Sequence, residues 1–214
     1  MTAATLAEHL RTSIPGPLQE PVLDDQQARA VAALLRCLGR YGLAKTNLDD
    51  VAREAGCSRA TLYRWVESKP ELLRLAVASE EARVLGALHG AVAGAPDLPD
   101  AIVAGVVTAS REIAGHDALQ FLLAHEPETV YGHLAFAEGD ALMVRIADAI
   151  APAFARWLPA SDGYRAADWL ARVVRAYCLT PQPVLDLTGE AVARPFLEQF
   201  VIPGIAGSPE SRKS

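Results

Sequence analysis

The stretch that decides the fold is "TNLDDVAREAGCSRATLYRWVESKPELL", residues 46–73. It holds two short runs of apolar residues at helical spacing, separated by Ala-Gly-Cys-Ser at residues 55–58. Gly56 suits a tight turn there, because glycine adopts backbone conformations that other residues avoid. Ala52 is small where two steeply crossing helices would approach each other. The spacing therefore predicts a helix-turn-helix.

Capping residues mark where these helices begin. Thr46 is the expected N-cap of the first helix, with Asp49 at the third position of a capping box. Ser58 is the expected N-cap of the second helix. Ser68 opens a longer helix that continues to about residue 88, and Pro70 lies in its first turn, where a missing N–H has no cost.

A further helix is predicted upstream of this stretch. Apolar residues at positions 31, 34, 35 and 38 form one stripe, which indicates a helix over residues 25–41. Asp24 or Asp25 can cap its start, and Gly42 suits its left-handed end. Together with the two short helices it makes a three-helix head.

The rest of the chain also reads as helices, over residues 99–114, 117–125, 127–157 with a weak point near 132–139, 162–180 and 188–202. Asp117 and Gln120 form an expected capping pair. No stretch alternates with period two, so we expect an all-α fold without a sheet. Residues 1–23, which contain three prolines, are expected to be a mobile arm, and residues 206–214 a disordered tail.

Composition bounds the class of protein. The chain has 214 residues, of which 51% are apolar and 21% charged, as in ordinary globular proteins. It lacks an apolar N-terminal segment and a run of about 18 apolar residues, so no signal peptide and no membrane span are expected. Three widely spaced cysteines suggest neither a disulfide framework nor a zinc site, and we expect a cytoplasmic protein.

Charge is distributed unevenly along the chain. The net charge of −6 argues against a nucleic-acid partner at first sight. Residues 24–69, however, hold eight Lys and Arg against six Asp and Glu. The field at one face matters more than the total charge, so this end can still meet a polyanion.

The second short helix has a polar face that suits DNA. Its side chains are Arg59, Thr61, Tyr63 and Arg64. Arginine can donate two hydrogen bonds to guanine O6 and N7, and Thr61 and Tyr63 can reach phosphates or a thymine methyl. The amides around Ser58 suit a phosphate. The alternative is a structural helical hairpin with a solvated basic face.

Residues 46–73 resemble the DNA-binding region of TetR-type transcriptional regulators. These are all-helical homodimers with an N-terminal helix-turn-helix head and a C-terminal ligand-binding and dimerisation domain. The resemblance covers about residues 24–75 at the level of motifs, and beyond them only the number and lengths of the helices. It implies a DNA-binding domain over residues 24–70 and a ligand-binding and dimerisation domain over residues 71–205.

The resemblance also implies roles for single residues. Thr46 would contact a phosphate, Tyr63 and Lys69 would hold the DNA backbone, and the residues facing bases would be Arg59, Ala60 and Thr61. The chain departs from the usual pattern at Cys57, where valine is common, at Trp65-Val66, where an aromatic-Phe pair is common, and at Pro70, where an acidic residue is common. None of these departures removes a DNA contact. The full expected DNA-binding set is Thr46, Ser58, Arg59, Ala60, Thr61, Tyr63, Arg64 and Lys69.

An apolar helical domain can hold a ligand pocket between its helices. Candidate lining residues are Phe121, His125, Phe136, Met143, Trp169 and Tyr177, although plain core is the commoner role for any one of them. Their character favours a small apolar or amphipathic effector. The segment "HEPETVYGH", residues 125–133, could be drawn as a metal site, but its spacing matches no ligand motif and a solvated turn is expected. No metal and no cofactor are predicted.

The two last helices would form the homodimer, according to the resemblance, through a four-helix bundle between protomers. Their apolar faces could equally pack inside one subunit. The predicted function is a regulator, most simply a repressor that a small effector releases from a palindromic double-stranded DNA operator. The alternatives are an all-α enzyme or a partner-binding protein that uses the C-terminal cavity. No nucleophile-with-base, GxGxxG, P-loop or HExxH motif supports an enzyme.

Overall fold

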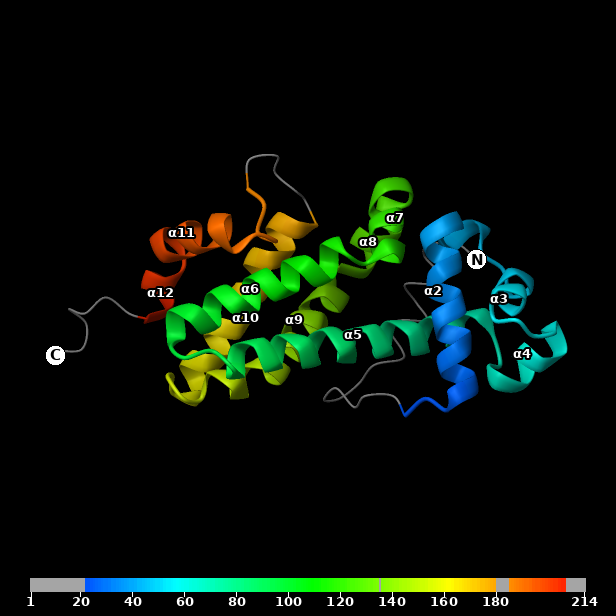
Figure 1. Ribbon diagram of the computed structural model, residues 1–214, viewed down its shortest axis with the longest axis horizontal. Coiled ribbons are helices and arrows are strands. Elements are labelled where there is room, and N and C mark those ends of the chain that lie inside the picture. Colours follow the sequence, from blue (N-terminus) through cyan, green and yellow to red (C-terminus); the bar gives the residue numbers. More distant parts are fainter. Residues whose placement is uncertain (1–21, 135, 180–184, 207–214) are drawn as a thin grey trace, which may run out of the picture. The chain divides into compact units, whose positions relative to one another are not determined.

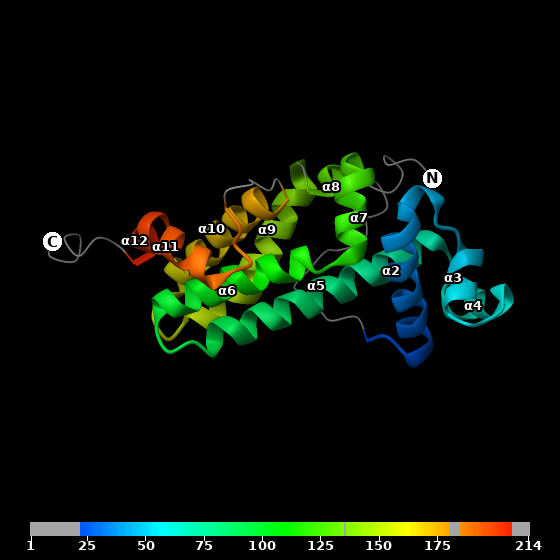
Figure 2. The same cartoon turned by 45° about the horizontal axis from the view of Figure 1, so that its top comes forward.

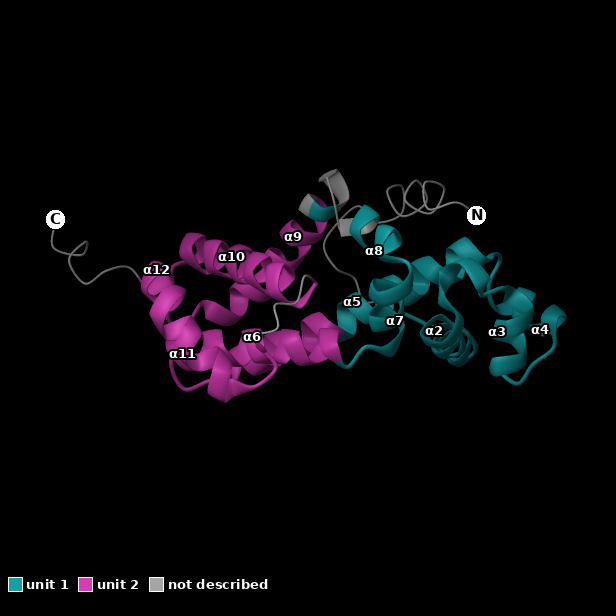
Figure 3. Ribbon diagram, turned by 90° about the horizontal axis from the view of Figure 1, so that it is seen from above, with its two compact units in different colours: residues 1–83, 115–140 teal, residues 84–114, 141–214 magenta. Residues whose placement is uncertain are grey.

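The computed structural model describes residues 22–134, 136–179 and 185–206, and every regular element within these residues is a helix (Figure 1). The predicted all-α class is confirmed. The predicted arm over residues 1–23 and the tail over residues 206–214 lie almost wholly outside the described residues. The chain divides into two compact units, one of residues 1–83 and 115–140 and one of residues 84–114 and 141–214 (Figure 3).

The first unit opens with α2 (Asp25–Lys45). Asp24 caps this helix, since its carboxylate accepts hydrogen bonds from the amides of residues 26 and 27, and the Gln27 side chain completes the capping box. Gly42 interrupts the helix with a φ of 75° and a ψ of 177°, next to the predicted end at residue 41. The expected positive φ of Gly42 is therefore confirmed, although a last turn follows it.

Two short helices follow, α3 (Leu48–Glu54) and α4 (Arg59–Trp65), and they form the predicted helix-turn-helix. Gly56 lies between them with a φ of 66°. Leu34 of α2, Val51 of α3 and Leu62 of α4 are each 0% exposed and belong to one core cluster. Because Leu62 is buried in this shared core, the opposite, polar face of α4 points to solvent.

The predicted N-cap of α3 is one residue out of place. Asn47, not Thr46, caps α3, because the Asn47 Oδ1 atom accepts from the amides of Asp49 (2.9 Å) and Asp50 (3.0 Å). Thr46 is instead buried, and its hydroxyl donates to the Gly42 carbonyl at 2.6 Å. The predicted Thr46–Asp49 capping box is wrong, since the helix begins one residue later than the apolar pattern suggests.

The capping pair predicted at the start of α7 (Asp117–His125) is also wrong. His116 is the N-cap, and its Nδ1 atom accepts from the amide of Leu119 at 3.2 Å. Asp117 is already inside the first turn. The pattern could not reveal this, because histidine is an uncommon capping residue.

The first unit is completed by the start of α5 (Lys69–Ala93), α7 and α8 (Pro127–Leu134). Ser68 Oγ accepts from the Glu71 amide at 3.3 Å, as a cap of α5 should. The helix α7 packs along α2 (Figure 2). The first unit includes α5 up to residue 83 and residues 115–140, so the two units differ from the predicted domains 24–70 and 71–205. The domain bounds stay predictions.

The second unit holds the end of α5, α6 (Leu98–Ala114), most of α9 (Phe136–Ile150), the short 3-10 helix η1 (Ala151–Phe154), α10 (Ala160–Cys178), α11 (Glu190–Phe200) and α12 (Ile202–Ala206). The weak point predicted in 127–157 is where α8 ends and α9 begins. Ile102, Phe154 and Leu197, each 0% exposed, are central to the core. Within the described part of the chain, no helix is long and apolar enough to cross a membrane.

Candidate nucleic-acid interface

The outward face of α4 is built on a buried inner face. Leu62 is 0% exposed and Val66, just after the helix, is 3% exposed. Ser58 caps the helix, and its Oγ atom accepts from the Thr61 amide at 3.1 Å. The solvent-facing residues of this element are consequently Ser58, Arg59, Ala60, Tyr63 and Arg64, with Thr61 half-buried.

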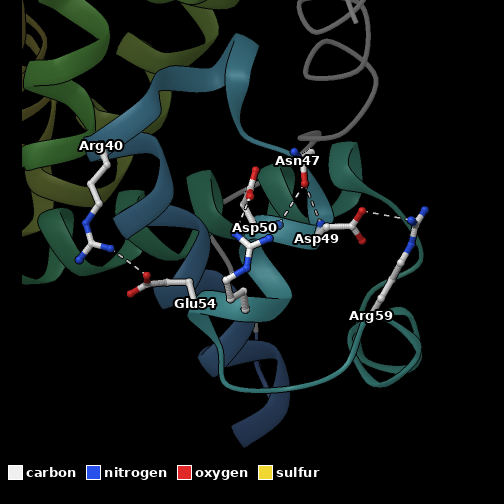
Figure 4. Close-up of polar contacts among 7 residues, drawn as sticks. Arg40, Asn47, Asp49, Asp50, Glu54 and Arg59 are labelled. Carbon is white, nitrogen blue, oxygen red and sulfur yellow. Dashed lines mark hydrogen bonds and ion pairs between the residues drawn. The ribbon is translucent and has the colours of Figure 1, made fainter.

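Arg59, the first residue of α4, is held from two sides. Its Nη1 atom lies 3.1 Å from Asp49 Oδ2 (Figure 4). Its Nη2 atom donates to the Tyr63 hydroxyl at 3.4 Å. The guanidinium carbon also lies 5.5 Å from the centre of the Tyr63 ring, within cation–π range. The hydrogen bond with Tyr63 and the charge of Asp49 raise the pKa of Arg59, which stays protonated.

Sequence reasoning missed the role of Asp49. The available signal was an acidic residue in the first turn of one predicted helix and a basic residue at the start of the next. Only the crossing of α3 and α4 shows that these two helix starts lie side by side.

Acidic side chains of α3 pair with arginines throughout the head. Asp50 Oδ1 lies 3.0 Å from Arg53 Nη1. A Glu54 carboxylate oxygen lies 2.8 Å from Arg40 Nη1 (Figure 4). The other lies 2.6 Å from Arg36 Nε. The hydrogen bond from Arg36 holds the pKa of Glu54 below its ordinary value. Arg36 and Arg40 therefore join α2 to α3 through Glu54.

Two residues that the resemblance assigns to phosphates have internal partners. Thr46 is 2% exposed, so its hydroxyl is not accessible to a phosphate in this structure. The Lys69 ammonium donates to the carbonyls of Leu43 (2.7 Å) and Thr46. Burial lowers the pKa of Lys69, against a smaller opposite effect of Glu126. The structure thus supports neither side-chain contact with DNA and gives Lys69 a structural role.

The six candidate pocket residues are divided between the two units. Phe121 and His125 stack in the first unit, with ring centres 4.2 Å apart, and line a cavity of about 650 Å³. Arg36, Arg40 and Glu80 line it as well, together with apolar side chains such as Leu35. The predicted ligand pocket stays a prediction.

The other candidates belong to α9 and α10. Met143 is 2% exposed and is core, whereas Trp169 is 39% exposed. Tyr177 meets the Phe196 ring edge-on at 5.3 Å. Phe136 opens α9, but its side chain lies outside the described residues. No group of three or more potential metal ligands occurs among the described residues. The side chain of His133 lies outside the described part of the chain.

Residues 30–76, from α2 into α5, match the family model for bacterial regulatory proteins of the tetR family. The chain belongs to the TetR family. It is also 27% identical, over 191 residues, to uncharacterized HTH-type transcriptional regulators from two strains of Mycobacterium tuberculosis, with 87% of this chain and 89% of each relative covered. This TetR-family chain is a DNA-binding transcriptional regulator.

Solved structures show the same fold. The TetR family repressor AlkX from a Dietzia strain is 21% identical with a TM-score of 0.58, and 86% of this chain and 98% of that chain are covered. The fatty acid degradation regulator FadR from Bacillus halodurans is 13% identical with a TM-score of 0.56, covering 84% and 97%. At these identities the likeness concerns the TetR-family fold alone.

Proposed function

We propose that this TetR-family protein is a repressor, not an enzyme, that binds a palindromic operator as a homodimer and is released by a small apolar or amphipathic effector. The observation that carries the proposal is the outward face of α4, which projects from a fully buried Leu62. An α-helix with such a face fits the major groove of DNA.

Within this proposal, α4 reads the operator. Arg59, Ala60 and Thr61 face the bases, while Tyr63 and Arg64 hold the DNA backbone. The amides at the start of α4, behind Ser58, receive a phosphate. Thr46 and Lys69 contribute indirectly, by fixing the connection between α2 and α3.

Dimerisation is proposed through α10 and α11. Trp169 is 39% exposed, Val192 43% and Phe200 60%, although large apolar side chains normally avoid water. Leu170 and Val174 point the other way and are buried within the unit. A second copy covering this surface would present two heads, which a palindrome with half-sites about 34 Å apart requires.

The nature of the effector is suggested by the structural neighbours. AlkX is a repressor implicated in the biodegradation of n-alkanes, and FadR is a regulator of fatty acid degradation. n-Alkanes and fatty acids both contain apolar hydrocarbon chains, in keeping with the apolar interior of the second unit. Such a ligand releases DNA if it binds the DNA-free state more tightly than the bound state.

Fluorescence anisotropy with duplexes from the DNA upstream of its own gene tests the proposal. We expect the binding constant to fall linearly with salt on a logarithmic plot. The alternatives, an all-α enzyme or a partner-binding protein, gain support only if no salt-dependent binding is found. Mass spectrometry of protein purified from cells would identify a retained effector.

The variant Arg59→Ala tests base reading. It should reduce discrimination at one base pair by about 1–3 kcal/mol, because a bidentate arginine–guanine contact has that effect. Arg64→Ala should instead weaken binding to all sequences alike, because Arg64 is proposed to contact the DNA backbone. An unchanged base preference of Arg59→Ala would show that Arg59 reads no base.

A further inference from the structure

We propose that Asp49 is a specificity-determining residue, which holds the Arg59 side chain at the DNA-facing surface and keeps it from pairing with phosphates at random. The inference rests on the proposed role of α4 in reading DNA. It assigns a function to a carboxylate on a surface where a negative charge by itself opposes DNA binding.

The backbone holds the Asp49 carboxylate in a fixed place. Asp49 lies in the first turn of α3, and the backbone amide of Asp49 donates to Asn47 Oδ1 at 2.9 Å. The positive end of the helix dipole stabilises a carboxylate at this position. The Oδ2 atom then reaches Arg59 Nη1 at 3.1 Å (Figure 4).

Arg59 remains able to read a base while it is held. Its side chain is 63% exposed, and its contacts with Asp49 and Tyr63 use one N–H each. A guanidinium has five N–H donors, so three stay available. The two partners restrict the rotamers of a long side chain before DNA arrives, which reduces the entropy lost on binding.

The Asp49–Arg59 ion pair also affects binding to DNA of any sequence. An exposed arginine without a carboxylate partner attracts every phosphate, and such contacts carry no sequence information. The Asp49–Arg59 pair has no net charge, and its carboxylate repels phosphates. Guanine offers two neutral acceptors, so a correct base can bind the held arginine where a phosphate is disfavoured. Asp49 thereby weakens non-specific binding more than specific binding, which is a gain in specificity.

The same turn provides a matched control. Asp50 also carries one carboxylate, and its amide also donates to Asn47 Oδ1, at 3.0 Å. Its side chain pairs with Arg53 at 3.0 Å rather than with Arg59 (Figure 4). Asp49→Asn and Asp50→Asn therefore remove the same charge from neighbouring positions, and only the first releases Arg59.

The test compares wild type with Asp49→Asn and Asp50→Asn on two duplexes. One is the duplex that the wild-type protein selects from a randomised library, and the other contains the same bases in scrambled order. We expect Asp49→Asn to bind the scrambled duplex more tightly and to lower the ratio of the two affinities about tenfold, which is 1.4 kcal/mol. Asp50→Asn should change the ratio less than about twofold, or roughly 0.4 kcal/mol. Asp49→Ser, with a shorter polar side chain in the turn, should behave like Asp49→Asn.

A double-mutant cycle with Arg59→Ala separates the pair from general charge effects. In that background Asp49→Asn should leave the ratio unchanged, because no arginine is released. The inference is overturned by an unchanged ratio in Asp49→Asn, by an equal fall in Asp50→Asn, or by a fall that persists without Arg59. If the wild-type protein itself selects no duplex over the scrambled one, it is the proposed function that fails.

Discussion

The ammonium group of Lys69 lies between two backbone carbonyls, those of Leu43 and Thr46, and so ties α5 to the connection that precedes α3. Without this donor, both carbonyls would lose a charge-assisted partner in a part-buried place. The side chain therefore matters to folding before it matters to DNA.

The variant Lys69→Met tests this role, because it keeps the aliphatic stem and removes the donor. We expect the free energy of unfolding in urea to fall by about 1–3 kcal/mol. Lys45→Met removes the same charge from an exposed position in the last turn of α2 and should change stability by less than about 0.5 kcal/mol. Wild-type stability with weaker DNA binding in Lys69→Met would favour the phosphate contact instead.

Glu54 makes the stability of the three-helix head depend on pH. Its pKa is lowered in the folded protein by Arg36, so folding is favoured above the pKa of the unfolded chain, about 4.3, and this contribution is lost as the pH falls through the folded-state pKa. Glu54→Gln should reduce stability at neutral pH and lose less than wild type between neutral pH and about pH 3. Urea midpoints across this pH range measure both effects, with Glu67→Gln as an exposed control. Parallel pH profiles for wild type and Glu54→Gln would contradict the ion pairing.

At the scale of elements, the end of α7 meets the break in α2. Both carboxylate oxygens of Glu126 lie 3.3 Å from the Ala44 amide, which donates to them. A Cβ atom on Gly42 would lie 3.1 Å from the Phe121 ring and would also collide with Glu126. Glycine is therefore needed at this position for two reasons, its positive φ and the approach of α7.

Two glycine variants separate those reasons. Gly56 also has a positive φ, but a Cβ there would come no nearer than 4.0 Å to Arg29 Nη2. Gly56→Ala should thus cost only the conformational strain, about 1 kcal/mol. Gly42→Ala should cost about 1–3 kcal/mol more, since Glu126 must leave Ala44. Thermal and urea unfolding of both variants measure the difference, and equal losses would mean that the α7 contact contributes nothing.

The positions of the helices could be predicted from the sequence, but the residues that cap them could not. Apolar spacing placed α2, α3, α4 and α7 to within a few residues, because burial imposes that spacing. The caps at Asn47 and His116 were missed, since several neighbouring residues can accept the same amides and only the path of the backbone selects one. The Asp49–Arg59 pair was missed for a related reason, as it depends on how two helices cross.

At the scale of the whole molecule, the exposed apolar surface of α10 and α11 leads to a prediction about assembly. If α10 and α11 form the proposed homodimer, Phe200→Asp should give a monomer in light scattering at concentrations where wild type gives a dimer, because a buried carboxylate without a partner is strongly disfavoured. Its affinity for the operator should fall as well. Val144→Asp changes another exposed apolar residue, 48% exposed on α9, and should stay dimeric. A dimeric Phe200→Asp would place the interface elsewhere.

The ligand pocket is the part that sequence could least predict. Aromatic residues such as Phe121, Trp169 and Tyr177 occur in cores and in pockets alike. Their function depends on which helix faces turn toward one another, and local periodicity carries no information on that. The helix-turn-helix was predictable because it forms one short continuous segment.

The pairing of the head's arginines with Asp49, Asp50 and Glu54 also bears on how ionic conditions affect the protein. Cations already balanced by carboxylates displace few of the counterions condensed on DNA, so little entropy is gained from their release. The protein would then lose less affinity in concentrated electrolyte than its number of arginines suggests. A chain with a net charge of −6 can in this way keep a DNA-reading surface while remaining repelled by bulk nucleic acid.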